Sequence, residues 1–277
     1  MQFDNLKKKQ EYYRSLTDYR LVPNSYVIVM LDGRSFSKKV KNKFNKPFDE
    51  RFVHAMNETT KYLCEQVHGC KFGYCQSDEI THAITDFETP VTGSFFEYRI
   101  SKILSICASM ASAKFNSIML ETRLSESLSR YASSEDNLTK LGQVLQNQPL
   151  YEFDCKAWNV PTFNDIYGWL LYRQLDCIRN SKQQTAQTYL SHKELMNLNT
   201  DEQITKLMQT NGVDWETFDD GLKYGRFIYR VETTGISPDG TTYTRNKFQV
   251  HEAFPISTEE GRQRFNDVCN IPKIEIV

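Results

Sequence analysis

The chain has 277 residues, of which 39% are hydrophobic and 25% are charged, and its formal net charge is −1. This composition is typical of a soluble globular protein, and the length fits one large domain or one core with a helical appendage. The near-neutral charge weakens the hypothesis of a nucleic-acid-binding protein without excluding it, because a local basic groove would be sufficient.

The N-terminus and the cysteines indicate where the protein resides. No window holds 18 apolar residues, and residues 1–9 lack the apolar core of a secretory signal, so we expect a cytoplasmic protein without a membrane span. The seven cysteines form no CxxC pair. Cys64, Cys70 and Cys75 lie close together in sequence but have no matching histidine pair downstream. Free thiols are therefore expected rather than a zinc site.

The first strong strand signal covers residues 26–31, after a polar and aromatic stretch, residues 1–20, in which we expect a helix. Six apolar residues run into Asp32-Gly33-Arg34, which is typical of a strand buried on both faces. Asp32 would then lie at the carboxyl end of a central strand, where α/β folds usually bind ligands. Gly33 allows the backbone to approach a phosphate or metal closely. The alternative is a plain turn, or a salt-bridged sheet edge in which Arg34 pairs with Asp32.

A lysine-rich segment follows. Residues 37–46 contain Lys38, Lys39, Lys41, Lys43 and Lys46, and the segment ends at Pro47-Phe48-Asp49. It is either a solvated loop or a cationic rim for the phosphates of a triphosphate or an RNA. From residue 49 the apolar spacing becomes helical, and His68-Gly69 ends that helix.

Residues 71–85 predict a β-hairpin whose tip, Gln76-Ser77-Asp78-Glu79, carries two carboxylates. His82 lies on the return strand, and we interpret it as a structural histidine. Residues 94–115 predict a long amphipathic helix. On it, Arg99 and Lys102 are three positions apart, so they could reach one anion or could simply be solvated.

The remaining segments complete the predicted fold. Residues 121–148 are polar and predict a weak helix or a flexible excursion, and residues 151–158 predict a strand. The order strand, helix, hairpin, helix, strand is that of the split βαβ, ferredoxin-like plan, an α+β fold with an antiparallel sheet. We assign residues 1–160 to this core. Residues 161–277 form an extension with helices over 164–186 and 191–209 and a final hairpin around residues 237–240.

Two aspartates on adjacent central strands predict a metal site. Asp32 at a strand end and Asp78 at a hairpin tip offer the hard oxygen ligands that Mg²⁺ prefers. Two such ions ~3.5–4 Å apart can clamp both oxygens of a phosphoryl displacement. This is the layout of the palm of a polymerase or a cyclase.

At this point the sequence resembles a known family. The motifs, in order, are Asp32-Gly33-Arg34-x-Phe36, Lys46-Pro47-x-Asp49, Gln76-Ser77-Asp78-Glu79, Arg99-x-x-Lys102, Phe153-Asp154 and Arg173-Gln174-x-Asp176. This order is similar to that of the tRNA-His guanylyltransferase family over roughly residues 25–185. The resemblance implies a palm-like core, two Mg²⁺ ions, ATP, GTP or other nucleoside triphosphates as substrates, and nucleotide addition to the 5′ end of tRNA. It also implies a homo-oligomer, a tetramer in this family.

The resemblance assigns roles residue by residue. Asp32 and Asp78, with the carbonyl of Gly33, would hold the metals and carry the catalysis. The residues implied to bind nucleotides are Asp32, Gly33, Arg34, Ser35, Phe36, Ser37, Lys46, Asp49, Ser77, Asp78, Arg99 and Lys102. Of these, Lys46, Asp49, Arg99 and Lys102 would serve the triphosphates or the RNA end. The residues expected to contact tRNA are Lys38, Lys39, Arg173 and Asn180.

One departure separates the chain from the guanylyltransferases proper. Those proteins carry His-Ile-Asn-Asn where this chain reads Ile178-Arg179-Asn180-Ser181. The change resembles the guanylyltransferase-like branch, for which templated repair of truncated tRNA 5′ ends is the expected activity. Two alternatives remain open: a nucleotide cyclase on the same palm, and a tRNA-binding protein without catalytic activity.

Overall fold

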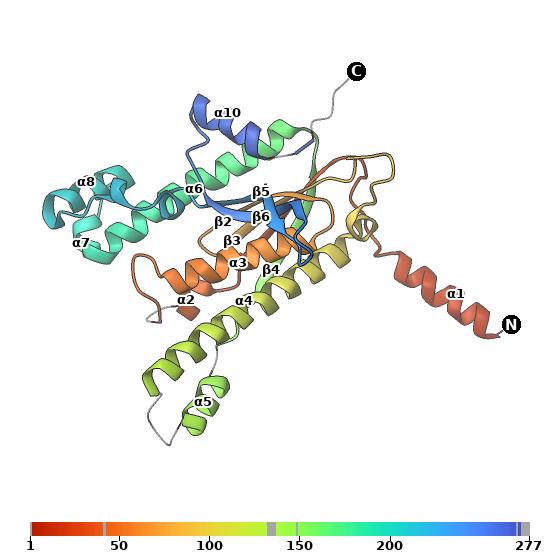
Figure 1. Ribbon diagram of the computed structural model, residues 1–277, viewed down its shortest axis with the longest axis horizontal. Helices are drawn as coiled ribbons and strands as arrows, with labels where there is room; N and C mark the ends of the chain where they lie inside the picture. Colours follow the sequence, from red (N-terminus) through yellow and green to blue (C-terminus); the bar gives the residue numbers. More distant parts are fainter. Residues whose placement is uncertain (1, 41–42, 132–136, 148, 270, 273–277) are drawn as a thin grey trace.

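A single antiparallel sheet of six strands forms the centre of the computed structural model (Figure 1). The structure describes all residues except 1, 41–42, 132–136, 148, 270 and 273–277. The strands lie in the order β4-β1-β3-β2-β5-β6. Their bounds are Tyr26–Gly33 (β1), Cys70–Gln76 (β2), Glu79–Ile84 (β3), Phe153–Val160 (β4), Arg226–Ile236 (β5) and Thr242–Glu252 (β6).

Strands β4-β1-β3-β2 make the predicted split βαβ unit. Helix α3 (Glu50–Gln66) connects β1 to β2, and helix α4 (Ile100–Tyr131) connects β3 to β4. Each neighbouring pair of strands is antiparallel, so the expected α+β core is confirmed. The predicted C-terminal hairpin is also present, and β5 extends the same sheet by pairing with β2. The boundary near residue 160 stays a prediction.

Helices cover both faces of the sheet. Helices α3 and α4 lie on one face, and α6 (Phe163–Tyr189) and α10 (Glu259–Val268) lie on the other (Figure 1). Val27, Val29 and Leu31 belong to the core on the α3 side, whereas Tyr26 and Ile28 belong to the core on the α6 side. Burial of both faces explains why β1 is continuously apolar. Because side chains alternate along a strand, Asp32 lies on the α6 side.

The helix after the hairpin differs from the prediction for residues 94–148. It begins with a short 3₁₀ segment, η1 (Phe95–Tyr98), and then α4 runs without a break to Tyr131. Ile118 and Met119 extend its buried face past Phe115, so packing favours continued helix where composition suggested an excursion. Helix α5 (Asn137–Gln146) follows, while residues 132–136 and 148 of the predicted excursion lie outside the described part.

Helix α4 also bears on the membrane prediction. By length and composition alone, its segment Ile100–Leu128 could cross a membrane, contrary to the expectation from the sequence. In this structure the helix packs against α3 and β4 with Ile103, Cys107, Ala111 and Phe115 fully buried. One face of the helix therefore belongs to the core.

Three other segments differ in detail. The lysine-rich segment begins with a short helix, α2 (Phe36–Val40), because the buried ring of Phe36 packs between those of Tyr151 and Phe153. The helix predicted over residues 191–209 is two helices, α7 (His192–Leu195) and α8 (Thr200–Asn211), each with its own capping box. The remaining elements are α1 (Gln2–Ser15), as expected, the short helices η2 (Trp215–Thr217) and α9 (Asp220–Lys223), and α10, which was not predicted.

We expect Gln174→Ala to destabilise the fold. The buried amide of Gln174 donates to the carbonyl of Phe254 at 2.9 Å and accepts from the backbone nitrogen of Ile256 at 2.8 Å. Leaving those two backbone groups without partners should lower the free energy of unfolding by about 2–4 kcal/mol in urea titrations. Gln187→Ala, an exposed position on the same helix, should change it by less than about 0.5 kcal/mol. Equal losses in the two variants would contradict this account.

Candidate active site

The end of β1 and the tip of the β2–β3 hairpin meet in close contact. The backbone nitrogen of Gly33 donates to the carbonyl of Asp78 at 3.0 Å. A Cβ atom at Gly33 would lie 2.7 Å from the ring of Phe36 and 2.9 Å from Cβ of Asp78, so only glycine fits there. The structure thus brings Asp32 and Asp78 to one edge of the sheet, as predicted.

Asp32 lies in a row of carboxylates. It is directly opposite Glu79 on β3 and Asp154 on β4, and side chains paired in this way share a face of the sheet. Among these, Glu79 is neutralised by Arg173 of α6, whose Nε and Nη2 donate at 2.8 and 2.5 Å. Within the part of the chain that the structure describes, no ion pair reaches Asp32, Asp78 or Asp154. The edge therefore carries excess negative charge.

The pKa values of the two aspartates reflect this excess. Burial and the charges of Asp78, Glu79 and Asp154 raise the pKa of Asp32 to about 6, against the opposing charge of Lys156. Burial also raises the pKa of Asp78, and the charge of Glu79 adds to it. Carboxylates crowded in this way are hard oxygen donors that lack a counter-charge, so the residues present fit a divalent cation such as Mg²⁺.

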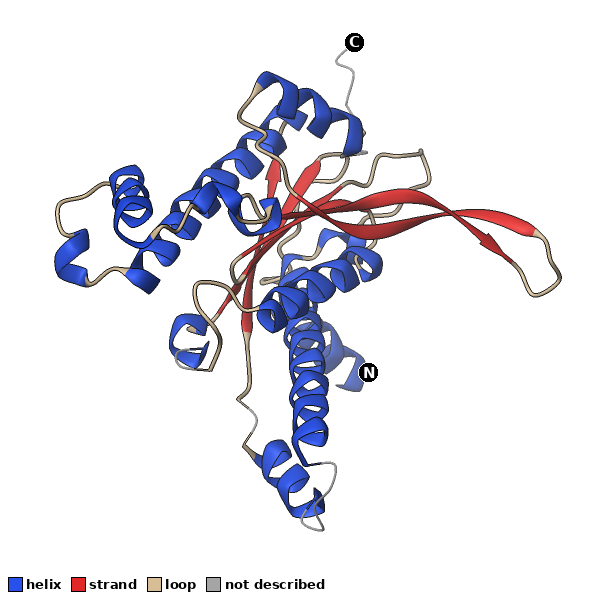
Figure 2. Ribbon diagram, turned by 60° about the vertical axis from the view of Figure 1, so that its left-hand side comes forward, coloured by secondary structure: helices blue, strands red, loops and turns tan. Residues whose placement is uncertain are grey.

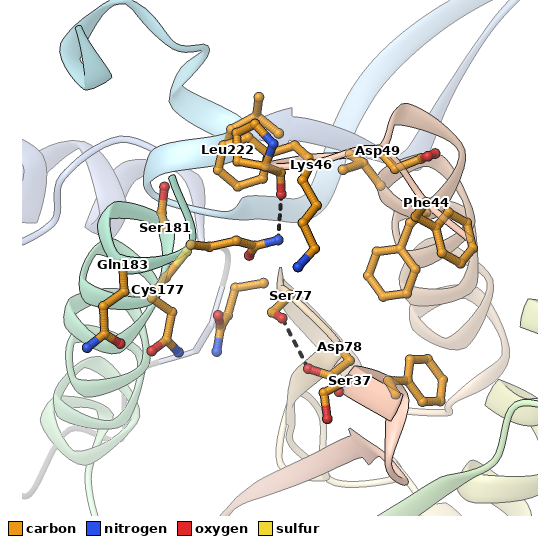
Figure 3. Close-up of a pocket in the computed structure, with 18 of the residues that line it drawn as sticks. Ser37, Phe44, Lys46, Asp49, Ser77, Asp78, Cys177, Ser181, Gln183 and Leu222 are labelled. Carbon is orange, nitrogen blue, oxygen red and sulfur yellow. Dashed lines mark hydrogen bonds between the residues drawn. The ribbon is translucent and has the colours of Figure 1, made fainter. Parts of the chain in front are cut away.

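A cavity of about 450 Å³ opens beside Asp78 (Figure 3). Phe36, Ser37 and residues between 44 and 53 form one wall, and α6 forms the other. Lys46 extends into the cavity toward Ser77 (Figure 3). The predicted residues that line it are Phe36, Ser37, Lys46, Asp49, Ser77, Asp78 and Asn180.

The sequence prediction missed much of this lining. Phe44, Phe48 and Phe52 supply aromatic rings on one wall. Gln183, Gln184 and Gln187 supply amides on the other, in line with Asn180. Positions 180, 183, 184 and 187 are three and four apart, so helical spacing could have revealed this amide row.

Several predicted residues have partners that define their place. Arg34 is 71% exposed in its side chain and pairs with Glu152 at 3.4 Å, so the alternative in which Arg34 pairs with Asp32 is wrong. Lys39 pairs with the same glutamate at 3.1 Å. Asp49 caps α3: although burial opposes it, the hydrogen bonds from Arg51 and the backbone of Asn45 lower its pKa.

Other predicted residues lie behind or far from the cavity. Arg173 is only 6% exposed and is held by Glu79 and Asp176, and Asp176 also accepts from Asn180 at 3.1 Å. Arg99 pairs with Asp18 and Glu97.

Arg99 precedes Phe115 on α4 by sixteen positions, and Phe115 is the residue of α4 that contacts the ring of Phe36. Arg99 is therefore roughly 24 Å along the helix from the cavity, and Lys102 is on the same distant turn. Within one copy of the chain, Arg99 and Lys102 therefore lie far from Asp32 and Asp78. The tRNA contacts assigned to Lys38, Lys39, Arg173 and Asn180 stay predictions.

A family model described as Thg1, tRNAHis guanylyltransferase, matches residues 6–161. The chain belongs to this family. Its members are nucleotidyltransferases. The chain is 31% identical over 233 residues to the uncharacterized protein R259 of Acanthamoeba polyphaga mimivirus, covering 81% of this chain and 75% of the relative. It is 26% identical over 249 residues to tRNA(His) guanylyltransferase 1 of Arabidopsis thaliana, covering 83% of this chain and 39% of that protein.

Solved structures agree with the Thg1 assignment. A bacterial tRNA(His) guanylyltransferase (Thg1)-like protein in complex with ATP matches with a TM-score of 0.75 and 29% identity, covering 93% of this chain and 96% of that one. A bacterial Thg1-like protein in complex with GTP matches with a TM-score of 0.72 and 28% identity, covering 95% and 98%. The likeness therefore extends through the C-terminal segment, beyond the residues that the family model matches.

We expect Arg173→Met to cost about 3–5 kcal/mol of unfolding free energy, because it leaves the partly buried charge of Glu79 unpaired beside Asp32. The double variant Arg173→Met/Glu79→Gln should recover part of that loss in a double-mutant cycle. Arg179→Met is the matched control, since Arg179 is 62% exposed and also pairs with Asp176. It should cost about 0–1 kcal/mol. If the double variant has the same free energy of unfolding as Arg173→Met, the ion pair between Arg173 and Glu79 does not account for the loss.

A second prediction concerns pH. Folding raises the pKa of Asp32 from 3.8 to about 6, so its contribution to stability is fully present below pH 3.8 and is lost as pH rises through 6. Without divalent ions, Asp32→Asn should therefore be more stable than the wild type at pH 7.5 by about 1–2 kcal/mol, after allowing for solvent screening. The difference should shrink toward pH 4.5. Denaturant titrations at the two pH values test this, and an unchanged difference would refute it.

Proposed function

We propose that this Thg1-family protein adds nucleotides to the 5′ end of tRNA, with ATP and GTP or other nucleoside triphosphates as substrates. The observation that carries the proposal is that Asp78 lines a cavity into which Lys46 extends, and that the hydrogen bond between Gly33 and Asp78 places Asp32 at the same edge of the sheet. The ATP and GTP complexes of the bacterial relatives support triphosphates as its ligands. A homotetrameric assembly and a cytoplasmic location belong to the same proposal.

Asp32, Asp78 and the Gly33 carbonyl are the groups that would hold Mg²⁺. When bound, the metal supplies a counter-charge to the phosphates and lowers the pKa of an attacking hydroxyl. The donor set fits because its carboxylates are crowded and lack a cation of their own among the described residues. The other requirement, binding of the nucleotide, is met by side chains that line the cavity.

The walls of the cavity suit a nucleotide. The phenylalanine rings can stack on a base of any identity, and the ammonium of Lys46 can offset phosphate charge. With the tRNA 5′ end held beside Asp78, the 3′-hydroxyl of the incoming nucleotide attacks the activated 5′ phosphate. The new phosphodiester bond forms as pyrophosphate leaves a triphosphorylated end, or as AMP leaves an adenylylated end.

The choice of nucleotide is the finer part of the proposal. Ile178 stands where guanylyltransferases proper carry histidine, and an isoleucine cannot donate or accept a hydrogen bond. A site without a specific polar contact loses discrimination between bases. We therefore assign templated repair of truncated tRNA 5′ ends to this protein, with Lys38 and Lys39 as contacts to the tRNA backbone.

We expect Asp32→Ala and Asp78→Ala each to reduce nucleotide addition by at least about 10³-fold, because either change deletes a ligand of the metal clamp. The control is Asp267→Ala, an exposed carboxylate on α10, which should retain wild-type activity. Labelled triphosphates and 5′-truncated tRNA transcripts give the rate, and the melting temperature reports folding. Near-normal rates in either folded variant would overturn the site assignment. Cyclic nucleotide formed without tRNA would identify a cyclase instead.

The templating test varies the base opposite the missing 5′ nucleotide through all four identities. Sequencing the product should show the complementary nucleotide in each case, and addition should slow once the acceptor stem is fully paired. Guanosine added regardless of the opposing base, and only to tRNA-His, would refute templated repair. That outcome would leave 5′ nucleotide addition itself intact, so the coarse and the fine parts of the proposal are tested separately.

A further inference from the structure

Two cysteines and a histidine form a buried cluster on the face of the sheet opposite to Asp32. Cys64 lies near the end of α3, Cys70 is the first residue of β2, and His82 is in the middle of β3. All three are at most 2% exposed. The Sγ atoms of Cys64 and Cys70 lie 3.5 and 4.0 Å from Nδ1 of His82, and all three atoms lie within 4.8 Å of one another.

Two glycines make this cluster possible. Gly73 pairs with His82 in the β2–β3 register, and a Cβ atom on Gly73 would lie 2.5 Å from Sγ of Cys64. The missing side chain therefore leaves the space that the sulfur occupies. Gly69, with φ +78°, turns the chain between α3 and β2. This turn brings Cys70 back beside Cys64.

We propose that Cys64, Cys70 and His82 bind a thiophilic d¹⁰ metal ion, Zn²⁺ or Cu⁺. Zn–S bonds of ~2.3 Å and Zn–N bonds of ~2.0–2.1 Å place sulfur and nitrogen ligands roughly 3.6 Å apart around a tetrahedral ion. The two observed sulfur–nitrogen separations of 3.5 and 4.0 Å bracket that value. An ion therefore fits among the three atoms with small adjustments of the side chains.

The charges of the three side chains also suit Zn²⁺. Two thiolates and a neutral imidazole give a complex with Zn²⁺ that carries no net charge, so it can be buried at low cost. Hydrogen bonds from Cys64 and His82 lower the pKa of Cys70, although burial opposes them. Cysteine binds a metal as the thiolate, so metal binding releases any proton that the thiols carry. Thiolate and imidazole ligands also select against Mg²⁺, which keeps this site distinct from Asp32 and Asp78.

The expected consequence is mechanical. The ion would join α3 to both strands of the hairpin whose tip carries Asp78, four positions before His82. It would thus stiffen the support of the candidate active site without touching a substrate. The sequence-based expectation of free thiols is the state that the test must exclude.

The test uses the full-length protein, purified under reducing conditions, stripped with a chelator and then titrated with Zn²⁺, Co²⁺ or, anaerobically, Cu⁺. We expect one equivalent of Zn²⁺ or Cu⁺ to remain after gel filtration and to raise the melting temperature by several degrees. Co²⁺ should give the near-ultraviolet charge-transfer absorption of thiolate ligands. Comparing the dissociation constants for Zn²⁺ and Cu⁺ shows which of the two ions the site prefers.

Variants locate the ion. Cys64→Ser and Cys70→Ser should lose the Co²⁺–thiolate absorption and weaken Zn²⁺ binding at least about tenfold, and Cys107→Ser, a buried cysteine outside the cluster, should do neither. If the variants fail to fold, the Co²⁺–thiolate absorption of the wild type still shows whether cysteines bind the metal. Absence of that absorption in the wild type, Zn²⁺ retained equally by Cys64→Ser, or a Cys64–Cys70 disulfide in place of bound metal would each overturn the proposal.

Discussion

The crowding of negative charge at one edge of the sheet is the constraint on which the candidate site depends. Asp32 is flanked on both neighbouring strands by acidic residues, which opposes folding unless some of the charge is neutralised. Among the acidic residues of this row, Glu79 is the one that pairs with Arg173. The arginine thereby removes one charge from the row and leaves Asp32, Asp78 and Asp154 available as oxygen donors. A sheet edge evolved only for stability would have no reason to retain them.

Helix α6 links this constraint to the rest of the fold. The residue after Arg173, Gln174, hydrogen bonds to the chain at Phe254 and Ile256, so one helix anchors both the acidic edge and the C-terminal segment. Roughly two to four turns further on, the same helix presents its amide row to the cavity (Figure 3). Figure 2 shows the far end of the β5–β6 ribbon extending away from the sheet on the other side, and of this ribbon only Arg226, at the start of β5, lines the cavity. The helix, rather than the ribbon, is therefore the second wall of the site.

The sequence predicted those features that depend on local pattern. Strand β1 was recognisable because burial on both faces leaves a continuous apolar run before Asp32, and the hairpin tip because two strands flank a short polar turn. The partners of Asp32 were not predictable, since Asp154 meets it only through the register of β1 and β4. The cysteine cluster was missed for the same reason: its third member, His82, joins it through strand pairing rather than through sequence spacing. Helix α10 shows the limit for short segments, because only its capping residue, Thr258, and two following glutamates signal it.

The length of α4 limits what Arg99 and Lys102 can do. Arg99 lies roughly 24 Å and Lys102 roughly 20 Å along the helix from the cavity, whereas an extended triphosphate spans less than about half of either distance. Within one copy of the chain, this pair cannot hold the phosphates of a nucleotide that reacts beside Asp78. A tRNA is long enough to reach both places, because an RNA duplex displays phosphates along its whole length. The resemblance implied either triphosphate or RNA contact for these residues, and the geometry of a single chain favours RNA, with the amide row and the phenylalanine rings left to hold the nucleotide.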